Sequence, residues 1–306
     1  MTIVLAGGSG FLGRKLSKRL HDEGHRTITL SRQANTRTGD QANLAAVDQI
    51  AWRPDGSAGD LPRTLDGVDA IVNLAGEGIA DKRWTSARKR ALRDSRILST
   101  QTLVSAIKQC ARPPRVFISG SGIGYYGPRG DEPVTEATPP GEDFLARLCV
   151  EWEEEAMKAD SAATRVVRVR SGIALDGDGG ALKKMLLPFK LGLGATIGSG
   201  RQYFPWVHAA DWTAMVSWLI GNDGARGAFN VTAPEPVTNR ELTRTLGRVL
   251  HRPAILHAPA FVLHAALGEL ATALVDGQRV LPALAEQLGF RFTYRALEPA
   301  LESMNL

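Results

Sequence analysis

The sequence predicts an α/β protein built on a doubly wound parallel sheet, with a smaller, discontinuous C-terminal domain. Strand-like apolar runs alternate with helical patterns through the first half of the chain, as in a parallel sheet with helices on both faces. The first run ends in a glycine-rich turn, and the alternation breaks after Gly172. We therefore expect the sheet in the N-terminal half and a substrate-facing part beyond this glycine.

The composition is that of an ordinary globular chain. Of the 306 residues, 43% are hydrophobic and 23% are charged, and a net charge of +5 is too small to indicate a nucleic-acid partner. Cys110 and Cys149 form neither a disulfide framework nor a metal-ligand spacing. No apolar run reaches the roughly 18 residues of a membrane span. We therefore expect a cytoplasmic protein with no metal, no nucleic-acid partner and no membrane partner.

The first residues predict a dinucleotide-binding βαβ unit. Residues 3–6 form an unbroken apolar strand, a helical pattern follows the glycines and ends at Gly24, and residues 27–30 form the next strand. Glycines at three-residue spacing allow a tight turn, close approach of a pyrophosphate, and close contact between helix and strand. The free amides of the helix N-terminus would bind the phosphates. The residues expected to contact the cofactor here are Gly7, Ser9, Gly10, Phe11, Leu12 and Gly13.

The end of the second strand favours NADP over NAD. An acidic residue at this place would bind the adenine ribose of NAD, whereas an arginine accommodates the 2′-phosphate of NADP. The chain has Ser31 and Arg32 there, and its next acidic residue is Asp40. Ser31 can donate to a phosphate oxygen, and Arg32 can bind it with two hydrogen bonds or stack on the adenine.

Four further strands are predicted, at residues 47–52, 69–74, 116–119 and 164–169. Helical patterns at residues 85–109 and 143–158 separate some of them. Ligands of doubly wound sheets bind at the carboxyl ends of the strands. The residues there that we expect to contact the cofactor are Trp52, Leu74, Ala75, Gly76 and Glu77.

A basic segment follows the fourth strand. Residues 81–96 contain seven Lys or Arg residues, a density usual for a solvated helix face. The alternative is that Lys82, Arg83 or Arg96 faces the cofactor or an anionic substrate, and Arg96 is included among the expected cofactor residues.

Several motifs together resemble the extended short-chain dehydrogenase/reductases. They are the N-terminal glycine pattern, the loop at residues 73–77, and Ser-Gly-Ser-Gly-Ile-Gly-Tyr-Tyr-Gly at residues 119–127. The blocks at residues 187–194, 197–208 and 277–282 are similar to the atypical, nucleoside-diphosphate-sugar epimerase-like branch, with its C-terminal segment of unknown function at about residues 253–301. The resemblance covers nearly the whole chain and implies an NADP-binding Rossmann-type fold with hydride chemistry.

The resemblance also implies a catalytic Ser, Tyr and Lys, with Lys four residues after Tyr. Ser121 matches the serine of that pattern. The Tyr-x-x-x-Lys pair is missing, because Phe144 and Leu148, or Leu145 and Cys149, stand in its place. Neither pair transfers protons at neutral pH with ordinary pKa values. The candidates that could replace it are Tyr125, Tyr126 and Glu77, with Lys82 as a source of positive charge.

The second half is expected to hold a discontinuous substrate domain. We assign residues 1–172 and 205–232 to the nucleotide-binding domain, and residues 173–204 and 233–306 to the substrate or cap domain. Asp211 is predicted to cap the apolar helix at residues 212–220, and residues 229–232 to return to the sheet as a strand.

These features predict an NADP(H)-dependent oxidoreductase or epimerase-like protein acting on an unknown small molecule without the usual Tyr-x-x-x-Lys pair. The alternative is a non-catalytic NADPH-binding sensor or interaction module, which the missing pair favours. A homodimer is left open.

Overall fold

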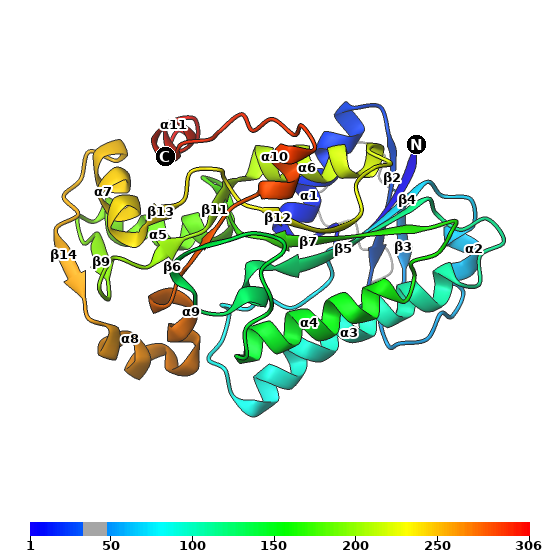
Figure 1. Ribbon diagram of the computed structural model, residues 1–306, viewed down its shortest axis with the longest axis horizontal. Coiled ribbons are helices and arrows are strands. Elements are labelled where there is room, and N and C mark those ends of the chain that lie inside the picture. Colours follow the sequence, from blue (N-terminus) through cyan, green and yellow to red (C-terminus); the bar gives the residue numbers. More distant parts are fainter. Residues whose placement is uncertain (33–47) are drawn as a thin grey trace.

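The computed structural model describes residues 1–32 and 48–306, and its centre is a parallel sheet (Figure 1). In the described part of the chain the sheet has seven strands in the order β12-β7-β5-β4-β1-β2-β3. This confirms the predicted doubly wound architecture. Val47, the first residue of the predicted strand at residues 47–52, lies outside the described residues. The strands are β1 (Thr2–Ala6), β2 (Arg26–Ser31), β3 (Asp48–Ala51), β4 (Ala70–Asn73), β5 (Val116–Gly122), β7 (Arg165–Ser171) and β12 (Gly227–Val231).

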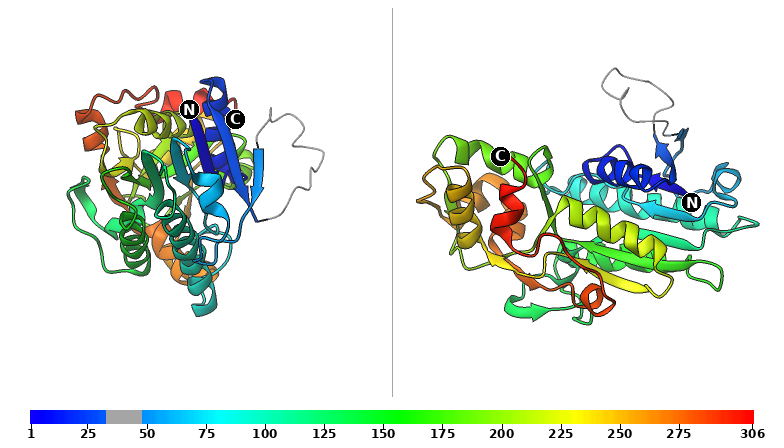
Figure 2. Two further views of the ribbon diagram at one scale, coloured as in Figure 1. Left: turned by 90° about the vertical axis from the view of Figure 1, so that its right-hand side faces the viewer. Right: turned by 90° about the horizontal axis from the view of Figure 1, so that it is seen from above.

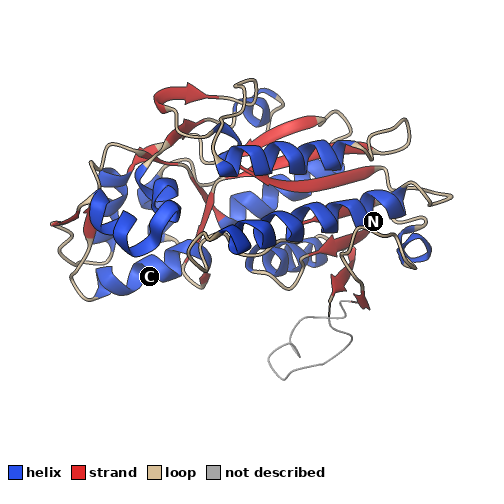
Figure 3. Ribbon diagram, turned by 90° about the horizontal axis from the view of Figure 1, so that it is seen from below, coloured by secondary structure: helices blue, strands red, loops and turns tan. Residues whose placement is uncertain are grey.

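Helices cover both faces of the sheet because the apolar side chains of each strand alternate between the faces. Helices α1 (Phe11–Asp22) and α6 (Ala209–Gly221) run over one face (Figure 2), where Ile3 and Leu5 belong to the same core cluster as Trp212. Helices α3 (Ser86–Ile107) and α4 (Phe144–Met157) run over the opposite face (Figure 3). The short helix α2 (Leu61–Leu65) belongs to this second side.

The two long helices begin at side-chain caps that the sequence supplies. The Thr85 hydroxyl oxygen accepts a hydrogen bond from the Arg88 amide at 3.1 Å, and Asp143 accepts one from the Ala146 amide at 2.7 Å. Such caps satisfy amides that have no partner inside the helix. The predicted helices at residues 85–109 and 143–158 are thus confirmed to within two residues at each end.

A second lobe lies at the end of the molecule away from the N-terminus (Figure 1). Its core combines Leu182 and Leu186 with Leu242 and Leu246. The remaining elements of the chain are η2 (Ile123–Tyr126), β6 (Gly130–Val134), β8 (Ile173–Asp176), α5 (Gly180–Lys190), β9 (Ala195–Ile197), β10 (Tyr203–Phe204), β11 (Trp206–His208), β13 (Val237–Thr238), α7 (Asn239–Val249), β14 (Leu256–Ala258), α8 (Ala260–Leu267), η3 (Gly268–Ala271), α9 (Thr272–Val275), β15 (Gln278–Val280), α10 (Ala283–Gln287) and α11 (Leu297–Glu302).

The cap of helix α6 differs from the sequence prediction. His208 is the capping residue, and its Nδ1 accepts a hydrogen bond from the Ala210 amide at 3.0 Å. Asp211 lies inside the first turn of α6, where its carboxylate accepts from the Thr293 and Tyr294 amides at 2.9 and 2.8 Å. The prediction of Asp211 as cap was wrong. The helix begins at residue 209, three residues before the predicted start, and the Asp211 carboxylate accepts hydrogen bonds from residues 293 and 294 instead of capping the helix.

The C-terminal segment returns to the sheet. Strand β12 pairs with β7, which confirms the predicted returning strand at residues 229–232. Beyond it, Ala285, Phe290 and Phe292 enter the same core cluster as the face of α1 and α6. Residues 283–292 therefore pack on the nucleotide side, although the division into two domains itself stays a prediction.

Candidate functional site

The segments that the sequence singled out lie at one edge of the sheet. In the parallel register, Ala6 at the end of β1 lies opposite both Leu30 of β2 and Asn73 of β4. Asn73 lies in turn opposite Ser119 of β5. The loops that follow these four strands therefore share the carboxyl edge, where ligands of doubly wound sheets bind.

The glycine turn after β1 requires its glycines. Gly7 has a φ of +82°, and a Cβ at this position would lie 2.6 Å from the Leu74 carbonyl carbon. A Cβ at Gly13 would lie 2.3 Å from the Gly7 oxygen. The turn is thus packed against the loop after β4 and against its own helix. Gly10 is the N-cap of α1 and makes no side-chain cap hydrogen bond, so the first amides of α1 keep no side-chain acceptor.

The start of α1 also touches the second lobe. Phe11 lies under the loop before α5, since a Cβ at Gly179 would come within 2.6 Å of its ring. Lys15, one turn further along α1, forms an ion pair with Asp176 at 2.6 Å. Ser9 is exposed and its carbonyl accepts from Arg14 at 2.5 Å, whereas Leu12 is half-buried.

The two residues predicted to select NADP lie at the end of β2. Arg32 is exposed, and Ser31 is half-buried with its carbonyl accepting from the Trp52 amide at 2.9 Å. The Trp52 side chain is 7% exposed and belongs to the core cluster on the α3 side. This geometry gives Trp52 a packing role beneath the strand ends.

The loop after β4 is held in place by side chains below it. The Asn73 side chain accepts from the Ala75 amide at 3.1 Å and donates to the Thr100 hydroxyl at 3.0 Å. Arg96 is 8% exposed and donates to the carbonyl oxygens of Leu92 and Glu77, both at 2.9 Å. Burial lowers the pKa of the Arg96 guanidinium. Arg96 therefore braces the predicted cofactor loop from the protein interior.

Two residues of this loop were predicted for chemistry or cofactor contact. Gly76 is exposed, and a Cβ there would meet the Arg96 side chain at 3.2 Å. The Glu77 carboxylate forms an ion pair with Arg88, and the Glu77 amide donates to the Ser95 hydroxyl at 3.1 Å. An ionised carboxylate accepts hydrogen bonds but cannot donate one.

Ser121 is the first member of a buried network. Its hydroxyl donates to the Glu153 carboxylate at 2.7 Å, and both side chains are buried. Arg170 binds both oxygens of that carboxylate, at 2.7 and 2.8 Å. The Glu153 carboxylate thus accepts from both Ser121 and Arg170, and the Ser121 hydroxyl, which donates to it, keeps lone pairs that can accept from other donors.

Tyr126 closes the same network from the other side. It is fully buried, its hydroxyl donates to Asn230 at 2.6 Å, and Arg170 donates to that hydroxyl at 2.9 Å. Burial raises the pKa of Tyr126 to about 12, with Arg170 opposing the shift. These two hydrogen bonds hold the Tyr126 side chain in place, and its raised pKa keeps the hydroxyl protonated.

Tyr125 differs from its neighbour. Its ring is half-buried and lies against Arg170, with the guanidinium carbon 3.4 Å from the ring centre. The two tyrosine rings meet edge to face at 5.2 Å. In the described part of the chain the Tyr125 hydroxyl has no hydrogen-bond partner. The cation stacked on the ring fixes its orientation and leaves the hydroxyl available.

Helix α4 places Leu145 and Cys149 against η2 and the end of β5. A Cβ at Gly124 would lie 3.0 Å from the Leu145 Cβ, and the Cys149 thiol donates to the Gly122 carbonyl at 3.7 Å. Phe144 points elsewhere, to the ring of Trp84 at 5.3 Å. Burial raises the pKa of the Cys149 thiol to about 11, so it stays protonated.

Sequence reasoning missed Glu153, Arg170, Asn230 and Glu136. Glu136 accepts from the amides of Asn230 and Leu284 at 3.0 and 3.2 Å, and burial raises its pKa. One signal was available: Glu153 lies four residues after Cys149, on the apolar side of the predicted helix. Arg170 stands near the end of a strand in which valines alternate with arginines, and a buried arginine needs a partner.

These features define a nucleotide-binding protein of the Rossmann type. The chain belongs to the NAD dependent epimerase/dehydratase family, whose model matches residues 3–232, and a domain of unknown function, DUF1731, matches residues 258–304. The family resemblance noted in the sequence is thereby confirmed, as is an epimerase-like, NAD(P)-binding fold. Among the residues that the structure describes, no helix has the length and apolar character needed to cross a bilayer.

The chain is similar over its length to curated relatives. The epimerase family protein YfhF of Bacillus subtilis is 39% identical over 305 residues, covering 99% of this chain and 98% of the relative. The epimerase family protein SDR39U1 of Bos taurus is 37% identical over 309 residues, covering 99% of both chains.

Two solved structures share the fold and part of the sequence. Human SDR39U1 (isoform 2), crystallised with NADPH, has a TM-score of 0.90 and 34% identity, with 99% of both chains covered. The nucleoside-diphosphate sugar epimerase of Corynebacterium glutamicum has a TM-score of 0.79 and 31% identity, covering 99% of this chain and 58% of that one.

Proposed function

We propose that this protein is an NADP(H)-dependent oxidoreductase or epimerase-like enzyme that acts on a small molecule without a Tyr-x-x-x-Lys pair. The observation that carries the proposal is the glycine turn at the carboxyl edge, with exposed Arg32 at the end of the neighbouring strand. Human SDR39U1, whose crystal structure was determined with NADPH, supports the choice of cofactor.

The residues at this edge fit a dinucleotide. Side chains at Gly7 or Gly13 would fill the space of the turn, and no side chain caps the first amides of α1. A helix N-terminus of this kind binds phosphate through its amides and its positive dipole end. In the proposal, Gly7, Ser9, Gly10, Phe11, Leu12 and Gly13 hold the pyrophosphate. Ser31 and Arg32 bind the 2′-phosphate, while Leu74 to Glu77 line the nicotinamide side.

A titration with NADPH and NADH tests this assignment. Arg32→Ala should weaken NADPH binding about ten- to hundredfold, as expected for the loss of hydrogen bonds to a charged group, and leave NADH binding unchanged. Arg63→Ala, which removes another exposed arginine of the same half, is the matched control. Equal affinity of the unchanged protein for both dinucleotides would contradict the choice of NADP.

Ser121 acts as a hydrogen-bond acceptor in the proposed reaction. Because its proton is directed to Glu153, its free lone pairs meet donors such as a carboxamide or a substrate hydroxyl. Bound NADPH supplies the hydride, and the chain must supply the proton.

Tyr125 is the proposed proton donor. Tyr125 lies in η2, directly after the strand β5 that carries Ser121. Its hydroxyl lacks a partner among the described residues, whereas Tyr126 is buried and bonded to Asn230. Glu77, the other candidate, already accepts from Arg88 through its carboxylate. A positioned proton donor contributes about 10²- to 10⁴-fold to a rate.

NADPH oxidation with a panel of aldehydes, ketones and quinones tests this role. Tyr125→Phe should lower turnover by about 10²-fold or more and preserve NADPH binding. Tyr126→Phe, the matched control, should lower stability and leave turnover of the folded protein largely intact. The role of Tyr125 is refuted if the first variant turns over as fast as the unchanged protein.

The second candidate is a non-catalytic NADPH-binding sensor or interaction module. Leu145 and Cys149 favour it, because they occupy the face of α4 nearest η2 and neither side chain transfers a proton at neutral pH. The sensor predicts tight NADPH binding with no turnover of any carbonyl compound, and a partner that binds one redox form alone.

The proposal keeps the other expectations drawn from the sequence. It places the protein in the cytoplasm, gives it a small-molecule substrate and no nucleic-acid partner, and leaves a homodimer open. Residues 1–172 and 205–232 bind the nucleotide, and residues 173–204 and 233–306 shape the substrate side.

A further inference from the structure

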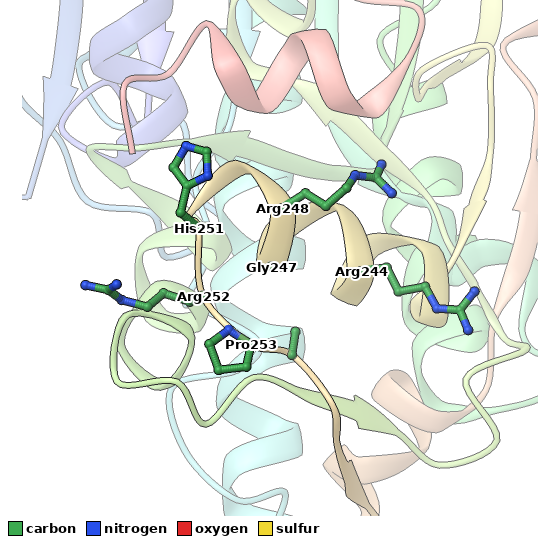
Figure 4. A pocket seen from close by; sticks show the side chains of 7 residues that line it. Arg244, Gly247, Arg248, His251, Arg252 and Pro253 are labelled. Atoms are coloured by element: carbon green, nitrogen blue, oxygen red, sulfur yellow. The ribbon is translucent and has the colours of Figure 1, made fainter.

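A hollow in the second lobe lies outside the site described above. It has a volume of about 830 Å³, and no acidic residue lines it. Figure 4 shows basic side chains spreading around its rim from α7 and the loop that follows. The lining residues are Arg244, Gly247, Arg248, His251, Arg252, Pro253 and Ala254.

Of the three arginines at the rim, one has a carboxylate partner and two have none among the described residues. Arg248 is bound by Glu298, with nitrogen–oxygen distances of 3.0 and 2.8 Å. Within residues 1–32 and 48–306, Arg244, Arg252 and the nearby Lys190 form no ion pair, and Arg252 bonds instead to the Lys190 carbonyl at 3.3 Å.

Two segments of this lobe carry more positive than negative charge. Residues 179–210 and 242–268 contain seven Lys or Arg residues and no Asp or Glu, whereas the whole chain has a net charge of only +5. Strands β9 and β14 join the two segments as a parallel pair. These two segments therefore bring an excess of positive charge to the hollow, although Asp178, Asp211, Glu241 and Glu269 flank them in the sequence.

Exposed aliphatic side chains stand beside the hollow. Leu187, Leu191, Leu193 and Ile255 are 65%, 66%, 55% and 86% exposed. Gly192, between two of them, would bring a Cβ to 3.6 Å from the ring of Pro253, which lines the hollow. A cluster of large aliphatic side chains that are more than half exposed is typical of an interaction surface.

We propose that this basic–apolar surface docks on the face of an anionic lipid bilayer. We define it by Arg244 and Arg252 at the hollow and by Leu187, Leu191, Leu193 and Ile255 beside it. The arginines meet anionic headgroups, and the aliphatic side chains enter the boundary between headgroups and acyl chains. The proposal replaces the expectation of no membrane partner, which rested on the absence of spanning segments.

The observations favour a bilayer over other occupants. A second copy of the chain would bring two unneutralised positive surfaces together, which is repulsive. A folded acidic protein would need a shape that matches these side chains, which come from α5, α7 and the loops after them, whereas a fluid lipid surface adapts to them. Leucine and isoleucine lack the aromatic faces on which single-stranded nucleic acids stack.

Sedimentation of the full chain with vesicles tests the proposal. The protein should bind vesicles of mixed phosphatidylcholine and phosphatidylglycerol, and not vesicles of phosphatidylcholine alone. Arg244→Gln should weaken binding about fivefold, as expected for one basic residue at a charged membrane. Ile255→Asp should weaken it at least about tenfold, because it places a charge where an aliphatic side chain entered the boundary.

Leu288→Asp and Arg291→Gln are the matched controls, because both residues are exposed near α10 and lie outside this surface. They should bind as the unchanged protein does. Circular dichroism melting of every variant separates lost docking from lost folding.

Three results would overturn the proposal. They are no binding to either kind of vesicle, binding that Ile255→Asp leaves unchanged, and equal losses in the control variants. A wild-type dimer in light scattering that Ile255→Asp converts to a monomer would also overturn it, in favour of self-association through this surface.

Discussion

The βαβ unit of residues 2–31 and the β5–α4–β7 unit of residues 116–171 meet at the same edge of the sheet, yet different interactions hold them. In the first, backbone meets backbone, and Gly7 and Gly13 make this possible by having no side chain. In the second, a buried Glu153 joins Ser121 to Arg170. The turn of the first unit has no room for a side chain at Gly7 or Gly13, whereas the second unit depends on the charge of Glu153.

This difference separates the tasks of the two units. A turn made of amides binds phosphate without any titratable group, so its binding should depend little on pH. A buried charged network fixes side-chain orientations and the direction of hydrogen bonds, which is what Ser121 and Tyr125 need. An added side chain should therefore disable the first unit, and the loss of a buried charge should disable the second.

The largest effect is expected from Glu153→Gln. The substitution leaves the Arg170 guanidinium buried without its counterion, which typically destabilises a protein by about 3–5 kcal/mol. Urea unfolding followed by circular dichroism measures the loss. In the matched control, Glu151→Gln breaks the exposed pair with Arg93 and should cost about 0–1 kcal/mol. Equal losses in the two variants would mean that the buried network is not what holds this unit.

The next effect is expected from Gly7→Ala. Alanine at a positive φ costs about 1–2 kcal/mol, and the clash with the Leu74 carbonyl adds about 1–3 kcal/mol of overpacking. NADPH binding should fall at least about tenfold, because the turn must move away from Leu74.

Gly24→Ala is the control for this substitution. Gly24 also has a positive φ, +79°, but a Cβ there meets nothing within 4 Å. It should therefore lose about 1–2 kcal/mol from strain alone and keep its affinity for NADPH. If both variants bind NADPH equally well, the turn does not form the phosphate site.

The smallest effect concerns His208, a buried group outside both units. Burial lowers its pKa below the ordinary value near 6.5, while Asp211 and Asp176 oppose the shift and Lys15 adds to it. The unfolded chain then binds more protons, so stability is complete above about pH 6.5 and falls as the pH drops, by up to about 1.4 kcal/mol per pH unit.

His208→Asn should flatten this dependence, because asparagine keeps a helix cap and does not titrate. Thermal unfolding measured between pH 7 and pH 5, a range of about two pH units that includes the ordinary histidine pKa, gives the slope of stability against pH. His264→Asn is the surface control. A wild-type slope retained in His208→Asn would exclude this histidine as its source.

The parts that the sequence predicted are those governed by local rules. Glycine spacing predicted the turn after β1, and helical patterns predicted where α3 and α4 begin. Apolar runs predicted the buried parallel strands. Each of these features depends on residues within one or two turns of chain.

The parts that it missed depend on contacts across the chain. Ser121 bonds to a residue 32 positions away, and Tyr126 to one 104 positions away. Residues 151–155 include four glutamates, and spacing along α4 alone does not show that Glu153, rather than the also buried Glu155, meets Ser121 and Arg170. The Asp211 prediction failed for the same reason, because the carboxylate serves amides 82 and 83 residues later.

The return of residues 283–292 to the sheet has a consequence for synthesis of the chain. Phe290 and Phe292 fill the core beside α1, and Glu136 and Asn230 bond to Leu284 and Leu281. Strands of the N-terminal half can pair as they leave the ribosome, but that core closes only when nearly the whole chain has emerged. Helices α1 and α6 cover most of that face earlier, but the apolar surface under residues 283–292 stays exposed until the end of translation. A truncation before residue 283 should therefore produce a chaperone client rather than a smaller nucleotide-binding domain.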